Sequence, residues 1–143
     1  MSDEKILLVD DEQEFTQVLA ERMKSRGLTV VTAENGPAAL KRASEETFDA
    51  IILDVMMPEM DGIETLKRLR EINPDLQIIM LTGHATLKAG VEAVKLGAMD
   101  FLEKPADIQR LMEKIKEAKI RKMVLVEKQT EEKLKKILET KGW

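Results

Sequence analysis

Two hydrophobic patterns alternate along the first 105 residues of the chain. Short apolar runs, mostly bounded by Asp, Gly or Pro, are typical of strands that are buried on both faces of a sheet. These runs cover residues 6–9, 28–31, 50–53, 78–81 and 99–102. Between them, apolar residues recur at helical spacing, as in Phe15, Leu19 and Met23. The alternation predicts an α/β fold, a doubly wound five-stranded parallel sheet with helices on both faces.

The last part of the chain has a different pattern. Residues 106–141 contain neither Gly nor Pro, and Asp107 is a candidate N-cap for one extended C-terminal helix. A polar interval around Thr130 leaves a break in this helix as an alternative. At about 1.5 Å per residue, the unbroken helix would extend past the edge of a small sheet. We therefore expect residues 1–118 to form the main domain and residues 119–143 to form a helical extension.

Composition excludes several classes of site. The chain of 143 residues contains no Cys, which rules out disulfides, thiolate metal sites and Cys nucleophiles. Its single His rules out a zinc site with several His ligands. The absence of Tyr and the aromatic content of 3% disfavour a base-stacking surface for nucleic acid. No apolar run could span a membrane and the N-terminus is acidic, so we expect a cytoplasmic protein without a membrane partner.

The net charge of −4 is unevenly distributed. Residues 106–143 hold 11 basic and 7 acidic residues, whereas residues 1–105 hold 12 basic and 20 acidic residues. The basic extension is too short for a helix-turn-helix module, which disfavours direct nucleic-acid binding. Apolar residues along it favour a homodimer formed through the C-terminal helix. These apolar residues are Ile120, Val124, Leu134 and Leu138.

Polar side chains occur where four of the predicted strands end. Asp10 and Asp11 follow the first strand, Asp54 follows the third, Thr82 follows the fourth, and Lys104 lies just beyond the fifth. Ligands of open parallel sheets bind outside the carboxyl ends of the strands, so we expect these side chains to meet at one rim. Clustered carboxylates suit Mg²⁺, with Mn²⁺ as an alternative. A carboxylate beside the metal can attack phosphorus and form an aspartyl phosphate, which the ammonium and hydroxyl groups would stabilise.

Four motifs lie in register along residues 5–105, namely LLVDDE, IILDVMMPEMDG, LTGHA and GAMDFLEKP. In this order and spacing, the chain resembles the receiver domain of two-component response regulators. The resemblance implies a flavodoxin-like fold and a signalling switch. A sensor histidine kinase or a phosphotransfer protein would phosphorylate this switch, which would then control a downstream protein that the sequence does not name.

The resemblance also implies roles for individual residues. Asp54 matches the phosphoacceptor and also a metal ligand. Asp10 and Asp11 match the acidic pair that holds Mg²⁺, and the backbone carbonyl of Met56 matches the remaining protein ligand. Lys104 matches the lysine that pairs with the phosphoryl oxygens.

A second group of positions matches the conformational switch of the family. Thr82 matches the hydroxyl that is drawn to the phosphoryl group, so it both stabilises this group and switches. Phe101 matches the aromatic side chain that packs inward when the hydroxyl moves. The resemblance further implies a cis bond between Lys104 and Pro105, which is readily tolerated only before proline.

Two positions are expected to tune hydrolysis of the aspartyl phosphate, Met56 and His84. Met56 has no polar group that could orient a water, which predicts slow autodephosphorylation, whereas His84 would oppose this effect. Receivers catalyse their own phosphotransfer and autodephosphorylation but act mainly as signalling switches. Classification of the chain as an enzyme is therefore left open.

Three other functions remain open from the sequence. The chain could be the receiver portion of a larger regulator with an ATPase or DNA-binding output, in which case the long helix is a linker. A metal-dependent phosphatase or hydrolase would need a second acid near the nucleophile and usually a cap domain, and neither is visible. A phosphorylation-independent binding module would not need the full set of Asp, Thr and Lys side chains.

Overall fold

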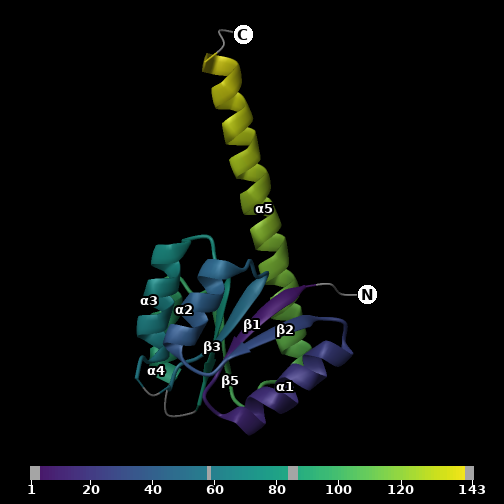
Figure 1. Cartoon of the computed structure of the whole chain (residues 1–143), viewed down its shortest axis with the longest axis vertical. Helices are drawn as coiled ribbons and strands as arrows, with labels where there is room; N and C mark the ends of the chain where they lie inside the picture. Colours follow the sequence, from purple (N-terminus) through teal and green to yellow (C-terminus); the bar gives the residue numbers. More distant parts are fainter. Residues whose placement is uncertain (1–3, 58, 84–86, 141–143) are drawn as a thin grey trace.

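The computed structural model describes residues 4–57, 59–83 and 87–140. Five strands form one parallel sheet in the order β2-β1-β3-β4-β5 (Figure 1). The strands are β1 (Lys5–Val9), β2 (Thr29–Ala33), β3 (Ala50–Asp54), β4 (Ile78–Thr82) and β5 (Asp100–Glu103). The chain runs outward from β1 to β2 and then crosses to β3, which places the switch point between β1 and β3. The predicted doubly wound parallel sheet is therefore confirmed.

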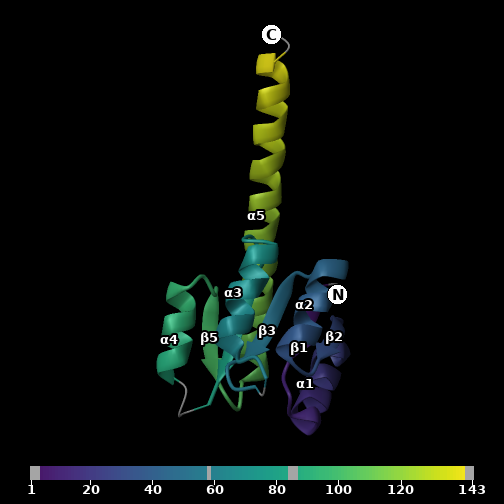
Figure 2. The same cartoon turned by 60° about the vertical axis from the view of Figure 1, so that its left-hand side comes forward.

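Helices cover both faces of the sheet (Figure 2). They are α1 (Gln13–Ser25), α2 (Gly36–Glu45), α3 (Gly62–Ile72), α4 (Leu87–Lys95) and α5 (Ile108–Thr140). Side chains alternate between the two faces of a strand, so Leu8 packs in the core beneath α1 and α5. Its neighbours Leu7 and Val9 pack in the second core, beneath α2, α3 and α4. Burial on both faces explains why the central strands are continuous apolar runs.

Local sequence determines where two of the helices begin. The side chain of Asn35 accepts a hydrogen bond of 2.8 Å from the backbone N–H of Ala38 at the start of α2. Asp61 accepts an equivalent bond of 2.8 Å at the start of α3. Such N-caps satisfy backbone donors that the first helical turn leaves unpaired. A Cβ at Gly62 would collide with the backbone of Asp54, so glycine lets α3 start directly against the end of β3.

The last helix, α5, is continuous over 33 residues. Asp107 caps it by accepting a hydrogen bond of 2.9 Å in the first turn, as its sequence predicted. Leu111, Ile115 and Ala118 are its buried residues, and they pack in the core that α5 shares with α1. The helix continues through Thr130 without interruption, so the alternative of a break at this position is wrong.

We call residues 119–140 of α5 the stalk. The stalk passes the end of the sheet at which the strands begin. There, Lys122 Nζ lies 3.4 Å from Asp49 Oδ1, just before β3, and Gln129 Nε2 donates a hydrogen bond of 2.6 Å to Asp75, just before β4. Beyond these contacts the stalk projects away from the body in both views (Figures 1 and 2).

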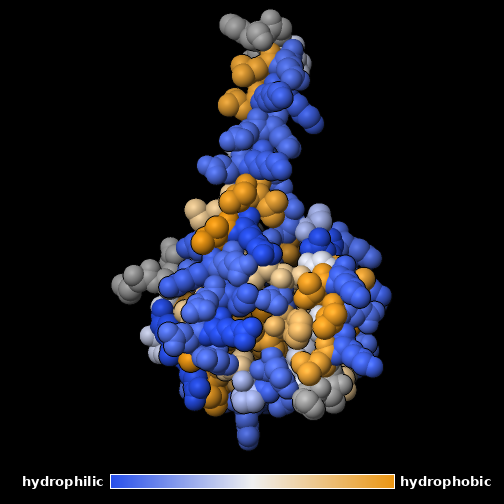
Figure 3. All heavy atoms as spheres, turned by 180° about the vertical axis from the view of Figure 1, so that it is seen from behind, coloured by the Kyte–Doolittle hydropathy of each residue, from blue (hydrophilic) through white to orange (hydrophobic). Residues whose placement is uncertain are grey.

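Apolar side chains remain exposed along the stalk. Figure 3 shows two apolar patches on it, separated by a hydrophilic stretch. The exposed apolar residues are Ile120, Met123, Val124 and Val126 near the body, and Leu134, Ile137 and Leu138 near the tip. Within the described ranges, no helix combines the length and the apolar character that crossing a membrane requires.

Candidate functional site

Side chains from four strand ends meet at one rim of the sheet. Asp10 follows β1, Asp54 and Thr82 are the last residues of β3 and β4, and Lys104 follows β5. The strands are parallel and paired in register, so their carboxyl ends lie side by side. The exposed fractions are 1% for Asp10, 4% for Asp54 and 0% for Thr82. The structure thus brings these four predicted site residues together and buries most of them.

The ammonium group of Lys104 lies among three carboxylates. Its Nζ donates a hydrogen bond of 2.7 Å to Asp10 Oδ2 and lies 3.5 Å from both Asp54 Oδ1 and Glu12 Oε1. The other carboxylate oxygen of Asp10 accepts a bond of 2.9 Å from the backbone N–H of Glu12. Because the Lys104 side chain is only 18% exposed, solvent screens these charges less than it would screen a surface pair.

Burial and neighbouring charges change the ionisation of this cluster. Desolvation, followed by the charge of Asp10, raises the pKa of Asp54 to about 6, against the opposing effects of Lys104 and the backbone N–H of Met56. Burial alone would lower the pKa of Lys104. The hydrogen bond to Asp10 and the charges of Asp10, Asp54 and Glu12 outweigh it, so the pKa of Lys104 is raised. The rim therefore holds a permanent cation beside a carboxylate that is costly to ionise.

Three carboxylates of the rim could hold a metal ion. Asp10, Glu12 and Asp54 each offer an oxygen, and these oxygens lie within 4.8 Å of one another. Such an oxygen donor set fits Mg²⁺. Asp11, a predicted ligand, is exposed and is not part of this cluster. Met56, whose carbonyl is the other predicted ligand, lies in the loop after β3 with 65% of its surface exposed.

The two predicted switch residues pack against α4. Thr82 Oγ1 donates a hydrogen bond of 3.4 Å to the backbone carbonyl of Leu102 on the neighbouring strand. Phe101 is half-buried and packs with the core beneath α2, α3 and α4. A Cβ at Gly90 of α4 would come within 2.9 Å of both the Phe101 ring and the Thr82 methyl group. A movement of either switch residue would therefore disturb the packing of α4.

Two further predicted positions concern the loops of the rim. The peptide bond between Lys104 and Pro105 is cis. His84, predicted to tune hydrolysis, lies outside the described residues. Its role therefore stays a prediction.

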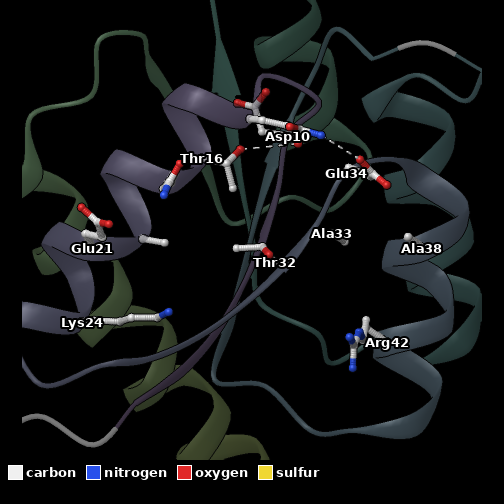
Figure 4. A pocket seen from close by; sticks show the side chains of 12 residues that line it. Asp10, Thr16, Glu21, Lys24, Thr32, Ala33, Glu34, Ala38 and Arg42 are labelled. Carbon is white, nitrogen blue, oxygen red and sulfur yellow. Dashed lines mark hydrogen bonds between the residues drawn. The ribbon is translucent and has the colours of Figure 1, made fainter.

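A groove of about 560 Å³ opens between α1 and α2 beside the rim. Asp10 lines one end of the groove, and Lys24 and Arg42 lie toward the other end (Figure 4). Gln13 on α1 donates a hydrogen bond of 3.4 Å to Glu34, just before α2. Three acidic and two basic side chains line the groove, so its charge favours neither an anionic nor a cationic ligand.

Two residues of the site, Glu12 and Phe15, were not predicted from the sequence. Glu12 directly follows the acidic pair in the motif LLVDDE, and this adjacency was a usable signal. Phe15 was interpreted only as part of the apolar face of a helix, yet Lys104 Nζ lies 4.5 Å from the centre of its ring. Nothing in the spacing of the sequence indicated that this ring would lie beneath a lysine.

Known proteins resemble this chain over most of its length. The family model of the response regulator receiver domain matches residues 6–116. The transcriptional regulatory protein ZraR from Klebsiella oxytoca is 39% identical over 113 residues, which cover 79% of this chain and 26% of that protein. The DNA-binding transcriptional regulator NtrC from Escherichia coli K12 is 36% identical over 113 residues, which cover 79% of this chain and 24% of that protein. The chain thus spans about a quarter of the length of these curated relatives.

Solved structures agree with the sequence match. The crystal structure of a response regulator receiver domain protein from Clostridium thermocellum has a TM-score of 0.82 and 34% identity to this chain. The similarity covers 85% of this chain and 98% of that one. The flavodoxin-like receiver fold that was predicted for this chain is therefore confirmed. By its sequence, its fold and the side chains at its rim, the chain belongs to the response regulator receiver family of two-component systems.

Proposed function

We propose that the chain accepts a phosphoryl group on Asp54 and thereby switches conformation to control a partner protein. The observation that carries this proposal is the position of the Lys104 ammonium, 3.5 Å from the Asp54 carboxylate at a mostly buried rim. A cation held there can stabilise the negative charge that spreads over the phosphoryl oxygens during transfer. Membership of the receiver family implies a histidine kinase as partner, and a phosphotransfer protein or this kinase would donate the group in the cytoplasm.

In the proposed step, a carboxylate oxygen of Asp54 attacks the phosphorus of a phosphohistidine. A P–O bond forms while the P–N bond breaks, and the electron pair of that bond leaves with the imidazole. Lys104 exchanges its hydrogen bond to Asp10 for one to a phosphoryl oxygen. The hydroxyl of Thr82 turns from the Leu102 carbonyl toward another phosphoryl oxygen, which lets the neighbouring aromatic side chain and α4 repack.

The same proposal includes a divalent cation, Mg²⁺ or Mn²⁺. Asp10 and Asp54 would hold it, together with the Met56 carbonyl and either Asp11 or Glu12. The oxygen cluster favours Glu12 as the additional carboxylate. When bound, the cation supplies charge neutralisation for the acidic rim and for the phosphoryl oxygens.

Incubation with acetyl phosphate and Mg²⁺ tests the proposed phosphorylation. We expect the wild-type protein to gain the mass of one phosphoryl group in intact mass spectrometry and the Asp54→Asn variant to gain none. The Asp75→Asn variant is a matched control, because Asp75 lies at the opposite end of the sheet, where its carboxylate accepts a hydrogen bond from Gln129 of the stalk. Phosphoryl uptake by the Asp54→Asn variant, or none by the wild type, would refute the proposal.

The Met56→Asn variant is expected to lose its phosphoryl group about three to ten times faster than the wild type, which is the effect of one well-placed hydrogen bond. The amide can orient the attacking water, which the apolar Met56 side chain cannot. Decay of the phosphorylated protein after removal of the donor measures the rate. Met123→Asn makes the same chemical change at an exposed stalk position and is expected to leave the decay unchanged. Equal decay in all three proteins would contradict the prediction.

A second proposal is that the chain is the receiver portion of a larger regulator. The chain spans about a quarter of its curated relatives, which are named as transcriptional regulators, and the buried residues of α5 end at Ala118. Residues 1–118 would then be the receiver domain and residues 119–143 a linker to an ATPase or DNA-binding output. The prediction against nucleic-acid binding concerns this chain alone. An immunoblot of source cells tests the proposal, because a band well above 16.2 kDa would support it.

We further propose that the stalk mediates formation of a homodimer. Its apolar patches are exposed, and burying them between two copies would remove apolar surface from water. The double variant Leu134→Glu, Leu138→Glu is expected to halve the mass measured by light scattering. The control variant Lys135→Glu, Lys136→Glu changes charge on the same turns and is expected to remain dimeric. An unchanged mass in the first variant, or a monomeric wild type, would contradict this proposal.

A further inference from the structure

Phe15 lies beneath the lysine of the proposed phosphorylation site. It is the third residue of α1, it is half-buried, and it packs against the core beneath α1 and α5. Lys104 Nζ lies over the ring, 4.5 Å from its centre. A cation within about 6 Å of an aromatic face is attracted by the negative potential of that face. The ammonium therefore has a fourth partner besides the carboxylates of Asp10, Glu12 and Asp54.

The ammonium beside this ring has limited access to solvent. Phe15, Pro105 and Ala106 line a shallow groove of about 350 Å³, and Lys104 is not part of this lining. The side chain of Lys104 is only 18% exposed. Attraction between a cation and an aromatic face is stronger where water does not compete for the cation.

The ring and the carboxylates play different parts when a phosphoryl group arrives. The hydrogen bond of 2.7 Å between Lys104 and Asp10 has to break before the same donor can bind a phosphoryl oxygen on Asp54. Attraction to the ring face does not depend on one donor direction, so it persists while the hydrogen bonds change partner.

We propose that Phe15 is a positioning residue for Lys104. The face of its ring holds the ammonium over the acidic rim while this group exchanges Asp10 for the phosphoryl oxygens. This role rests on the proposed phosphorylation of Asp54. Phe15 itself touches neither the phosphoryl group nor the donor, so its effect is exerted through Lys104.

Three variants separate the ring from the volume that it fills. Phe15→Leu keeps an apolar side chain but removes the aromatic face, whereas Phe15→Tyr keeps the face and adds a hydroxyl to a ring that lines the adjoining groove. Phe48→Leu is the matched control, because Phe48 is a buried ring that lies 5.3 Å from Lys5 Nζ, and neither belongs to the rim. Thermal unfolding of each variant separates the loss of core packing from the effect on the site.

The first measurement is the initial rate of phosphoryl uptake from acetyl phosphate with Mg²⁺. We expect a rate about three- to tenfold lower in Phe15→Leu, and a rate near that of the wild type in Phe15→Tyr and Phe48→Leu. The second measurement is the NMR resonance of the Lys104 ε-methylene group without metal. The ring current should shift it upfield in the wild type and in Phe15→Tyr, and the shift should disappear in Phe15→Leu.

Equal uptake by the wild type and Phe15→Leu would overturn the proposal. So would an equal loss in the Leu and Tyr variants, since packing rather than the aromatic face would then be responsible. An unshifted Lys104 resonance in the wild type would refute the contact itself. If the wild type takes up no phosphoryl group, the proposed function fails and the role of Phe15 fails with it. If the wild type takes up no phosphoryl group but still shows the ring-current shift, the contact between Lys104 and the Phe15 ring has only a structural role.

Discussion

Lys104→Met is expected to slow phosphoryl uptake about 100-fold and to lower the free energy of unfolding by about 3 kcal/mol. The Met side chain is similar in size but carries no charge. Asp10, which is 1% exposed, then loses its partner at 2.7 Å and becomes a buried carboxylate without a cation. Uptake falls because the phosphoryl oxygens lose the ammonium that would stabilise their developing charge. Uptake from acetyl phosphate and urea unfolding without metal measure the two effects.

Lys114→Met provides a matched control for the loss of a lysine ion pair. Lys114 Nζ lies 2.6 Å from Asp100 Oδ2, but the two side chains are 24% and 31% exposed and lie away from the rim. Partly exposed pairs of this kind contribute at most about 1 kcal/mol, so stability should change little and uptake not at all. If Lys104→Met and Lys114→Met lost similar amounts of stability and of uptake rate, the burial of the Lys104 ion pair would have no special effect.

Asp54→Asn is expected to stabilise the metal-free protein at neutral pH while it abolishes phosphorylation. Burial and the charge of Asp10 raise the pKa of Asp54 from 3.8 to about 6, so ionisation of this group opposes folding. One pKa unit corresponds to about 1.4 kcal/mol, which gives a cost of at most about 3 kcal/mol above pH 7. The amide of Asn avoids this cost because it carries no charge. Urea unfolding of both proteins at several pH values measures the difference.

The pH range of this effect follows from the direction of the pKa change. Well below the reference pKa of 3.8, Asp54 is protonated in the folded and unfolded states, so wild type and variant should differ least in stability. As the pH rises from about 4 to about 6, the unfolded chain loses this proton while the folded wild type keeps it, so the stability difference grows; it levels off above about pH 6, where both states are ionised. A difference that is the same at pH 4 and pH 8 would contradict this origin. Saturating Mg²⁺ is expected to reduce the stability difference between the wild type and Asp54→Asn, because the cation relieves the repulsion between Asp10 and Asp54.

The sheet could be predicted because its central strands are buried on both faces. The predicted runs 50–53 and 78–81 lie within β3 and β4. The bounds of the edge strand β2 were predicted less accurately, since the predicted run 28–31 corresponds to the strand Thr29–Ala33. Leu28 is buried, but its N–H bonds to the Met23 carbonyl at the end of α1 rather than to a strand. An apolar residue marks burial, and burial alone does not assign it to the sheet.

Helical spacing identified α4 but not its buried face. Val91 and Val94 are large apolar residues at helical spacing, yet they are 47% and 40% exposed. Gly90 and Ala93 are buried instead. Their small size lets the helix approach β4 and β5 closely, and a side chain at Gly90 would collide with Phe101. A pattern based on hydrophobicity favours large apolar residues and overlooks close contacts made by small ones.

The site was predictable only as far as the topology determined it. Parallel strands with polar residues at their carboxyl ends bring Asp10, Asp54 and Lys104 together regardless of loop details. The choice between Asp11 and Glu12 depends on the backbone conformation of the turn after β1, which residue spacing does not specify. Both residues are exposed, but Glu12 lies 3.5 Å from Lys104 Nζ and belongs to the carboxylate cluster, whereas Asp11 does not.

The helix α5 runs from one end of the sheet to the other and continues beyond it. It starts beside the rim, crosses the length of the sheet and leaves at the opposite end, where Lys122 and Gln129 tie it to loops of the body. From Ala118 to Thr140 it extends about 33 Å, at 1.5 Å per residue. A tilt of about 5° at its base would thus displace its tip by about 3 Å. For a rigid helix held at one end, a small repacking at its base would therefore become a larger displacement at its tip.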